Sequence, residues 1–365
     1  MPIAPNHALA TLTIDLDAVA ANYQILRARH LGGAVSAVVK ADGYGLGALA
    51  VGKRLYREGC RHFFVATLDE ALELAPAVPT ALVATLTGVA PAAARGQALS
   101  GVVPVINSLP ELVLWRAEAH RLGRSLPAFL HIDTGMNRLG LAPGEVDQLA
   151  QDPGLLSGIE LRFILTHLVS AERPREPISG IQLGRFRAAC ARLPRALRSI
   201  ANSSGMFLGP DFASDLARPG SALYGVNPTP ARPNPMQGVV RLTARVLQVR
   251  DVPAGETVGY NGIWEAQKPS RIATIGAGYA DGLLRSLSNR GQAYFDGTPL
   301  PLVGRVSMDL ITFDVTALPD LGPGDNLELI GPQQSVDAFA AGAETSAYEI
   351  LTSLGTRYAR SWLGA

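Results

Sequence analysis

The chain has 365 residues, of which 47% are hydrophobic, and its 32 basic and 31 acidic residues give a formal net charge of +1. A charge so close to balance excludes a strongly basic surface for nucleic acid or for an anionic membrane. The longest weakly polar run, residues 81–94, contains threonines and a proline and is too short to span a bilayer.

Two further features bear on the cellular compartment. The first residues lack a basic stretch followed by an apolar one, so we expect no signal peptide. Cys60 and Cys190 lie far apart and lack the spacing of metal ligands. The sequence therefore predicts a cytoplasmic protein with two buried or incidental thiols and no metal site.

In chain order, residues 11–16 alternate like a β-strand, and Asp15 or Asp17 can cap the helix that follows. This strand is assigned either to the domain that follows it directly or to a second domain further along the chain.

The next stretch, SAVVKADGYGLG at residues 36–47, predicts a short buried strand that ends at Lys40 in a glycine-rich turn. Glycines let backbone N–H groups approach a ligand closely, and Tyr44 adds a hydroxyl. Burial lowers the pKa of an amine at the edge of an apolar pocket and makes it a usable nucleophile or base. A lone lysine at a strand end is usually just solvated. Amine, turn and hydroxyl together predict a Schiff-base lysine for pyridoxal phosphate.

Short apolar runs then alternate with helical patterns. The strand-like runs cover residues 35–39, 62–66, 81–86, 102–106, 128–132, 159–165, 199–202 and 216–223. The helical patterns cover residues 46–59, 69–74, 91–99, 109–122, 143–151 and 178–193. This alternation predicts an α/β fold, a (β/α)8 TIM-type barrel over residues 1–235. An open doubly wound sheet is the alternative, but no GxGxxG motif opens the first unit.

Active-site residues of such barrels lie at the carboxyl ends of the strands. Polar residues follow five predicted strands: Lys40; Asp133, Met136 and Arg138; His167; Asn202 and Ser203; and Arg218, Gly220 and Ser221. Taken alone, Asp133 indicates a turn and His167 a hydrogen-bonded core histidine. Their convergence at one face predicts a site, with a phosphate near the last two strands.

A proline-rich segment, residues 227–238, marks the predicted domain boundary. Strand signals dominate the predicted second domain, residues 236–365, at 239–249, 256–259, 271–275, 292–295, 301–306, 310–315 and 326–330. A helix near residues 348–354 and a basic tail complete this smaller, mostly-β domain. Its tyrosines, Tyr260 and Tyr279, are ordinary interface or core aromatics when taken alone.

VVKADGYGLG resembles the cofactor-lysine signature of the alanine racemases. The resemblance covers residues 11–360 through HIDTGMNRLG, ANSSG, RPGSALYG, VGYNG, GYADG, GRVSMD and AYEILTSLGTRYAR. It implies a barrel plus a β domain, assembled as a head-to-tail homodimer. Each active site of such a dimer combines the lysine of one subunit with a tyrosine from the other subunit's C-terminal domain.

The resemblance also implies residue roles. Lys40 would be the cofactor lysine and one catalytic base, and Tyr260 would be the second base. The cofactor would be contacted by Arg218 at the pyridine nitrogen, by Asn202 and His167, and around the phosphate by Tyr44, Ser203, Gly220, Ser221 and Tyr348. Arg138 would bind the cofactor's phenolic oxygen and the substrate carboxylate, Met308 would contact the substrate, and Tyr279 and Asp309 would line the entrance. Racemisation moves a proton off one face of Cα and onto the other, which explains the two bases. Arg218 keeps its proton, which should suppress transamination.

Two positions depart from common family patterns. His131 stands where many members have a lysine modified to a carbamate that orients the arginine, so an anion or His131 itself must orient Arg138. Ser199 stands where some relatives have histidine.

The predicted function is a pyridoxal-phosphate-dependent alanine racemase that supplies D-alanine for peptidoglycan or serves alanine catabolism. A broad-specificity amino-acid racemase and a non-catalytic cofactor-binding barrel are the alternatives, and the second domain with Tyr260 argues against the binder. A basic amino-acid decarboxylase is disfavoured because it would carry an acidic residue at the position of Arg218.

Overall fold

The computed structural model describes residues 7–365, which form two compact units. The barrel unit comprises residues 20–223 and 227–236. The β unit comprises the described residues up to 19, residues 224–226 and residues 237–365. Helix α1 (Leu16–Arg29) begins in the β unit and ends in the barrel unit.

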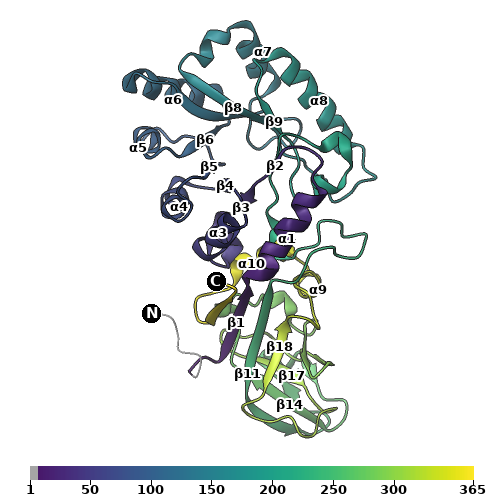
Figure 1. The fold of residues 1–365 in the computed structure, drawn as a ribbon. Helices are drawn as coiled ribbons and strands as arrows, with labels where there is room; N and C mark the ends of the chain where they lie inside the picture. The colour runs from purple at the N-terminus through teal and green to yellow at the C-terminus, as the bar shows by residue number, and fades with distance from the viewer. Residues whose placement is uncertain (1–6) are drawn as a thin grey trace. The chain divides into compact units, whose positions relative to one another are not determined.

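The barrel unit is built on parallel strands that follow one another in sequence order and in space (Figure 1). They are β3 (Ala37–Val38), β4 (His62–Val65), β5 (Leu82–Thr85), β6 (Val103–Ile106), β7 (Leu126–His131), β8 (Ile159–Leu165) and β9 (Leu197–Ser199). Parallel neighbours need a crossover between them, and helices supply it here. The α/β barrel fold predicted from the alternating pattern is confirmed.

The barrel closes through β2 (Ala34–Val35) and β10 (Leu216–Ala217), which pair in parallel. The Arg218 N–H donates to the Ala201 carbonyl at 2.8 Å and links β10 to the chain after β9. The Val38 N–H donates to the Pro219 carbonyl at 3.0 Å and links β3 to the chain after β10. The last predicted strand therefore lies between the first and the seventh.

Three predicted strands differ in extent from the observed ones. The run at 35–39 is divided at Ser36, whose hydroxyl donates to the Ala217 carbonyl at 2.8 Å. The seventh strand ends at Ser199 instead of reaching residue 202. The eighth is extended only as far as Ala217, because Pro219 has no N–H to continue a ladder and the 3-10 turn η5 (Ser221–Tyr224) follows.

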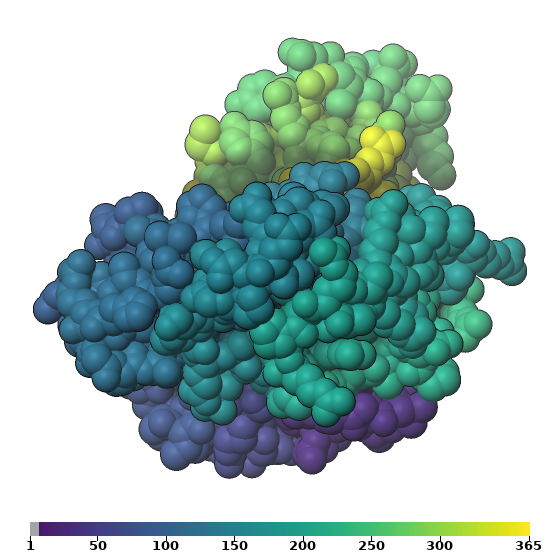
Figure 2. Space-filling view, turned by 90° about the horizontal axis from the view of Figure 1, so that it is seen from above, coloured from purple at the N-terminus to yellow at the C-terminus, as the bar shows by residue number. Residues whose placement is uncertain are grey.

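Helices cover the outer face of these strands (Figure 1). They are α3 (Ala48–Arg57), α4 (Leu68–Leu74), α5 (Ala94–Ser100), α6 (Leu109–Leu122), α7 (Pro143–Gln151) and α8 (Ile178–Arg192). The boundaries of α6 follow from local chemistry, since the Ser108 hydroxyl accepts from the Glu111 N–H and Gly123 has a left-handed φ of 64°. In the space-filling view, the blue-to-teal segments of this unit lie side by side (Figure 2).

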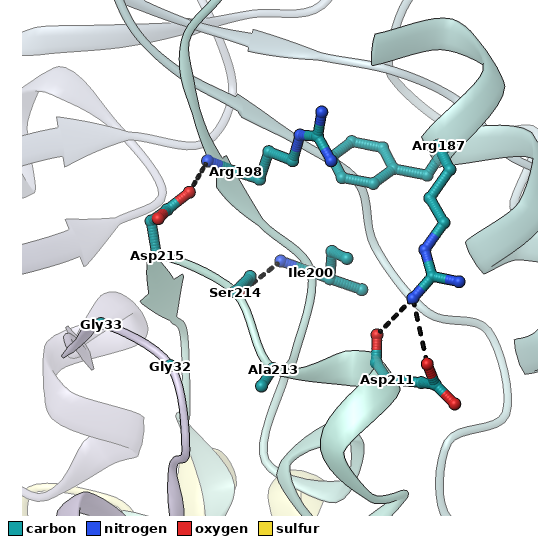
Figure 3. Close-up of a pocket in the computed structure, with 10 residues that line it drawn as sticks. Gly32, Gly33, Arg187, Arg198, Ile200, Asp211, Ala213, Ser214 and Asp215 are labelled. Atoms are coloured by element: carbon teal, nitrogen blue, oxygen red, sulfur yellow. Dashed lines mark hydrogen bonds and ion pairs between the residues drawn. The ribbon is translucent and has the colours of Figure 1, made fainter. Parts of the chain in front are cut away.

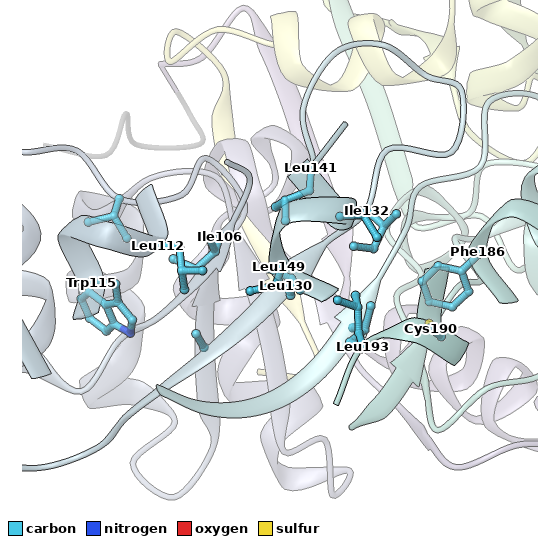
Figure 4. Close-up of a cluster of buried hydrophobic side chains, with 14 of the residues drawn as sticks. Ile106, Leu112, Trp115, Leu130, Ile132, Leu141, Leu149, Phe186, Cys190 and Leu193 are labelled. Atoms are coloured by element: carbon cyan, nitrogen blue, oxygen red, sulfur yellow. The ribbon is translucent and has the colours of Figure 1, made fainter. Parts of the chain in front are cut away.

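Two apolar clusters hold the barrel unit together. The outer one packs α6, α7 and α8 against the strands and includes Trp115, Leu130, Ile132, Leu149 and Phe186 (Figure 4). The inner one fills the barrel with the rings of Phe64, Phe129 and Phe163, whose neighbouring centroids lie 5.5 and 4.9 Å apart. Side chains that fill a barrel from inside give the site at its mouth a rigid floor.

The β unit is a mostly antiparallel sheet with short helices. Its strands are β1 (Ala10–Asp15), β11 (Val240–Val252), β12 (Thr257–Val258), β13 (Trp264–Glu265), β14 (Ser270–Ile275), β15 (Gln292–Phe295), β16 (Thr298–Pro301), β17 (Ile311–Asp314), β18 (Asn326–Ile330) and β19 (Ala359–Leu363). Its α-helices are α9 (Val336–Gly342) and α10 (Ala347–Ser353).

Strand β1 pairs antiparallel with β11 and parallel with β19. The expected basic tail is thus a strand that pairs with β1. The strand expected at 301–306 is replaced by β16, which lies earlier in the chain and ends at Pro301. A tight turn precedes β16, and Asp296 in this turn has a left-handed φ of 45°. Over residues 7–365, no helix is both long enough and apolar enough to cross a membrane.

Candidate active site

Lys40 follows β3 directly and opens the short helical segment α2 (Lys40–Gly45). The backbone of Ala41, Asp42, Gly43 and Tyr44 is left-handed, with φ between 51° and 62°. Such a conformation costs roughly 1–2 kcal/mol for each residue that carries a Cβ. Strain of this size persists only where the surroundings hold the backbone in place.

Three hydrogen bonds hold this turn. The Glu70 carboxylate, at the start of α4, accepts from the Ala41 N–H at 2.6 Å. The Asp42 carboxylate accepts from the Ala48 N–H at 2.8 Å, and the Asp42 carbonyl accepts from the Gly47 N–H at 2.8 Å. Glu70 also completes the capping box of α4 with Thr67. The sequence signals the capping box, but nothing in it signals the bond to Ala41.

The amine of Lys40 is partly buried, and burial is the main reason that its pKa is lowered. The positive charge of Arg138 lowers this pKa further, while Glu70 opposes the shift. A lowered pKa increases the fraction of the amine that is neutral at a given pH. The amine can therefore act as a nucleophile or as a base.

Arg138 stands at the end of a turn that Asp133 organises after β7. The Asp133 carboxylate accepts from the backbone N–H groups of Gly135 and Met136, each at 2.9 Å, and from that of Asn137. Asn137 has a left-handed φ of 54°. Asp133 is therefore a turn residue, and the charge of Arg138, which follows this turn, acts on Lys40, His131 and His167.

A small polar nook joins the loops after β9 and β10 to α2. The Ser203 hydroxyl accepts from the N–H groups of Gly220 and Ala222, at 3.0 and 3.2 Å, so its own hydrogen remains for another acceptor. A Cβ built on Gly220 would lie 2.3 Å from the Tyr44 hydroxyl. Ser221 is buried beside them. Hydroxyls and N–H groups so arranged fit a phosphate.

Arg218 is buried at the centre of the carboxyl ends of β8, β9 and β10. Its Nη1 donates to the Ser199 hydroxyl at 2.5 Å, and its Nη2 donates to the Thr166 carbonyl at 2.6 Å. Burial lowers its pKa to about 10, so the guanidinium is still charged at neutral pH. A hydroxyl is therefore the side-chain partner of Arg218 in this chain.

Two neutral histidines flank this cation. Burial first, and then the charge of Arg218, lowers the pKa of His167 to about 3 and that of His131 to about 4. His131 Nδ1 lies 2.8 Å from Asn107 Oδ1. Since the Asn107 amide nitrogen already donates to the carbonyls of Leu86 and Val105, its oxygen must accept, and the proton sits on His131 Nδ1.

Asn202 has a local partner. Its side-chain oxygen accepts from the Gly205 N–H at 2.9 Å and caps the 3-10 turn η3 (Ser204–Phe207). The structure brings together Lys40, Tyr44, Arg138, His167, Ser203, Arg218, Gly220 and Ser221 at the carboxyl ends of the barrel strands.

The remaining predicted site residues belong to the β unit. Tyr260 opens the 3-10 turn η6 (Tyr260–Gly262) and is 68% exposed, and Tyr279, Met308 and Tyr348 are also exposed. The Asp309 carboxylate accepts from Arg357 Nη1 at 2.7 Å.

Arg357 also forms two bonds to the Asp281 carboxylate. These acceptors raise the pKa of Arg357. Sequence reasoning missed this pair of carboxylates on one arginine.

A separate cavity of about 360 Å³ lies at the amino ends of β2 and β10 (Figure 3). Arg187 forms an ion pair with Asp211 there at 3.2 Å, and the Asp215 carboxylate accepts from the Arg198 N–H at 2.7 Å. These residues are distant in the fold from Lys40 and compensate one another. Among residues 7–365, no group of three or more His, Cys, Asp or Glu side chains has metal-binding geometry.

Comparison with known proteins agrees with this geometry. The family described as alanine racemase, N-terminal domain, matches residues 14–228, and the family described as alanine racemase, C-terminal domain, matches residues 239–362. An alanine racemase of Acidiphilium cryptum is 55% identical over 350 residues, covering 96% of this chain and 98% of that one. A catabolic alanine racemase of Mesorhizobium japonicum is 48% identical, covering 100% and 96%.

Among solved structures, an alanine racemase from Bartonella henselae with covalently bound pyridoxal phosphate superposes with a TM-score of 0.95 at 43% identity, covering 98% of this chain and 100% of that one. The chain therefore belongs to the alanine racemase family of pyridoxal-phosphate-dependent isomerases.

Proposed function

We propose that this chain interconverts L-alanine and D-alanine, with Lys40 and Tyr260 as the two bases. The observation that carries the proposal is the amine of Lys40, which follows β3 in a strained turn and has a lowered pKa beside Arg138. A base whose pKa is lowered toward the working pH removes a Cα proton most effectively when it is rigidly held. The inner apolar cluster of the barrel, with Phe64, Phe129 and Phe163, supplies that rigidity.

The residues present fit pyridoxal phosphate, which supplies the electron sink that acidifies Cα when it is bound. Lys40 would hold it covalently, and Tyr44, Ser203, Gly220 and Ser221 would receive its phosphate. The closeness of Gly220 to the Tyr44 hydroxyl supports this fit, because any side chain at Gly220 would fill the nook.

The other residues around Lys40 have proposed tasks that follow from their protonation. Arg218 would lie at the pyridine nitrogen of the bound cofactor and, because its guanidinium keeps its proton, would leave that nitrogen unprotonated. Arg138 binds the carboxylate of alanine through a charge-assisted pair. His167 is neutral at working pH and adds no further positive charge.

We further propose that two copies assemble head to tail, so that Tyr260 of one copy acts in the barrel of the other. The exposure of Tyr260 (68%), Met308 (53%) and Tyr279 (44%) supports this assembly, since large apolar side chains gathered in one unit favour an interface. Met308 would then contact the substrate, with Tyr348 near the phosphate and Tyr279 and Asp309 at the entrance.

Mixing two inactive variants tests the shared site. Lys40→Ala and Tyr260→Phe, refolded or coexpressed together, should recover about one quarter of the wild-type sites in a statistical mixture of dimers. No recovery, although mixed dimers form, would contradict a site shared between subunits. A light-scattering mass of the wild type provides the control for assembly.

Chiral chromatography tests the reaction. Purified protein with pyridoxal phosphate should bring L-alanine to nearly equal amounts of both enantiomers and leave L-lysine, L-arginine and L-serine largely unchanged. Comparable conversion of lysine or arginine would favour a broad-specificity racemase. A Lys40-dependent absorbance band without any D-product would leave a cofactor-binding protein. The cytoplasmic location is a further prediction, which cell fractionation tests.

A further inference from the structure

Gln182 on α8 is fully buried, and both hydrogens of its amide nitrogen and its amide oxygen are hydrogen-bonded. Its Oε1 accepts from the Val169 N–H at 2.9 Å. Its Nε2 donates to the His167 carbonyl at 2.9 Å and to the Thr134 hydroxyl at 3.0 Å. One side chain of the outer helical layer therefore joins the segment after β7 to the segment after β8.

The hydrogen bonds continue from Gln182 toward the centre of the site. The buried hydroxyls of Thr134 and Thr166 lie 2.7 Å apart. Because Gln182 donates to Thr134, the Thr134 hydrogen is available for Thr166. The carbonyl of Thr166 accepts from Arg218 Nη2 at 2.6 Å. A short chain of bonds thus runs from Gln182 through Thr134 and Thr166 to Arg218.

The same helix holds the turn that carries Arg138. Nη1 of Arg185 donates to the Thr134 carbonyl at 2.9 Å. Thr134 directly follows Asp133, whose carboxylate shapes that turn. Gln182 binds the hydroxyl of Thr134 and Arg185 binds its carbonyl, so α8 holds both the side chain and the backbone of this residue in place.

We propose that Gln182 is a positioning residue for racemisation, which sets Arg138 and Arg218 at their working separation by tying Thr134 to the Thr166–His167 segment. This inference rests on the proposed function. Buried polar networks of this kind are rigid, because a group that loses its partner inside the protein cannot form a replacement hydrogen bond with water. A displacement of about 1 Å in a positioned group can cost about 100-fold in rate.

The test replaces Gln182 with methionine, which keeps the length and volume of the side chain but removes the amide. Two matched controls lie on the same helix. Leu183→Ala truncates a buried apolar neighbour without touching the network. Ser179→Ala removes a buried hydroxyl that has no hydrogen-bond partner among residues 7–365.

The expected result separates positioning from mere stability. In cofactor-free protein, Gln182→Met and Leu183→Ala should both lower the melting temperature. Assayed well below both melting temperatures, Gln182→Met should lose about 10- to 100-fold in kcat/KM, with a higher KM for alanine and a shifted absorption maximum of the bound cofactor. Leu183→Ala and Ser179→Ala should stay within about twofold of wild type.

A double-mutant cycle with Thr134→Val provides the second readout. If both residues act through the same bonds, the double variant should be no worse than Gln182→Met by more than about twofold. Additive losses would overturn the proposal, and so would kcat/KM and a spectrum equal to those of Leu183→Ala. A wild type that fails to racemise alanine would instead overturn the proposed function, while the spectral shift would still report on Gln182.

Discussion

The two ends of the barrel strands differ in how their charges are arranged. At the carboxyl ends, the charges of Lys40, Arg138 and Arg218 act on one another and on two histidines, and several pKa values are far from normal. At the amino ends, Arg187 pairs with Asp211 in an exposed position, with side chains that are 54% and 76% exposed. Of the cations at the carboxyl ends, Arg218 is buried and has no carboxylate partner within residues 7–365, and an unpaired buried charge costs free energy, so a protein keeps it only where it serves a task.

The two ends also differ in backbone strain. Lys40 begins a turn in which three residues with a Cβ are left-handed. The loops that line the amino-end cavity place glycines, Gly32 and Gly33, against the backbone of Ser214 and Asp215, where a Cβ would collide. At the amino ends, glycine avoids a steric collision, and the backbone of Gly32 and Gly33 is not left-handed. At the carboxyl ends, the sequence accepts strain in order to place Lys40.

The largest effect is expected for Lys40→Ala. This change removes a base and the cofactor's attachment point, so kcat should fall by at least about 10³-fold. A stopped chiral assay measures the loss. The fold should be intact, because the left-handed turn is held by Glu70 and Asp42 and not by the amine. Retention of a tenth of the activity would contradict the role of Lys40.

Arg218→Glu should change the reaction as well as its rate. A carboxylic acid can protonate the pyridine nitrogen, so transamination should rise relative to racemisation. Pyruvate formation during incubation with alanine measures this side reaction. An unchanged ratio of pyruvate to D-alanine would contradict the account of Arg218. Arg218→Gln is the matched control, because it removes the same guanidinium bonds to Ser199 and Thr166 but adds no carboxyl group.

Gly220→Ala should weaken cofactor binding by about tenfold, because the new Cβ would meet the Tyr44 hydroxyl. The backbone of Gly220 is not left-handed, so the substitution tests only whether there is room for a Cβ. Titration of cofactor-free protein with pyridoxal phosphate measures the dissociation constant. Tyr44→Phe alone is the reference for the double variant: adding Gly220→Ala to Tyr44→Phe should cost less than adding it to the wild type, because the hydroxyl that the new Cβ would meet is gone.

A smaller effect is expected from pH on the cofactor-free protein. His131 and His167 are neutral when folded, with pKa values of about 4 and about 3, against about 6.5 when unfolded. Below pH 6.5 these histidines become protonated in the unfolded chain but stay neutral in the folded chain. Stability is therefore full above pH 6.5 and falls toward pH 4, by up to about 1.4 kcal/mol per pH unit for each histidine.

Urea unfolding between pH 7.5 and 4.5 measures this slope. His131→Gln should flatten it, because glutamine can still meet Asn107 but does not titrate. The same slope in wild type and variant would show that carboxylates alone account for acid unfolding.

The smallest effect is expected at the amino ends. Arg187→Ala removes one partner of an ion pair whose side chains are both more than half exposed, so stability should change by less than about 1 kcal/mol. Racemisation should not change. A tenfold loss of activity would mean that the two ends of the barrel are coupled and would remove the contrast drawn above.

The sequence by itself determined the alternation of strands and helices, because apolar periodicity and glycine turns are local properties. That was enough to predict the barrel and to place Lys40, His167 and Arg218 at strand ends. It also determined the family through motifs such as VVKADGYGLG. The roles of the predicted site residues and the predicted domain limits at 235 and 236 stay predictions.

Only the tertiary structure decided how these residues are held. Glu70 reaches Ala41 from 29 positions away, Gln182 reaches Thr134 from 48, and Arg218 reaches Thr166 from 52. Bonds between such distant partners have no signature in local composition. The same is true of the depressed histidine pKa values, which come from burial and from the charge of Arg218. A sequence names the groups of a site, but their distances and surroundings set their chemistry.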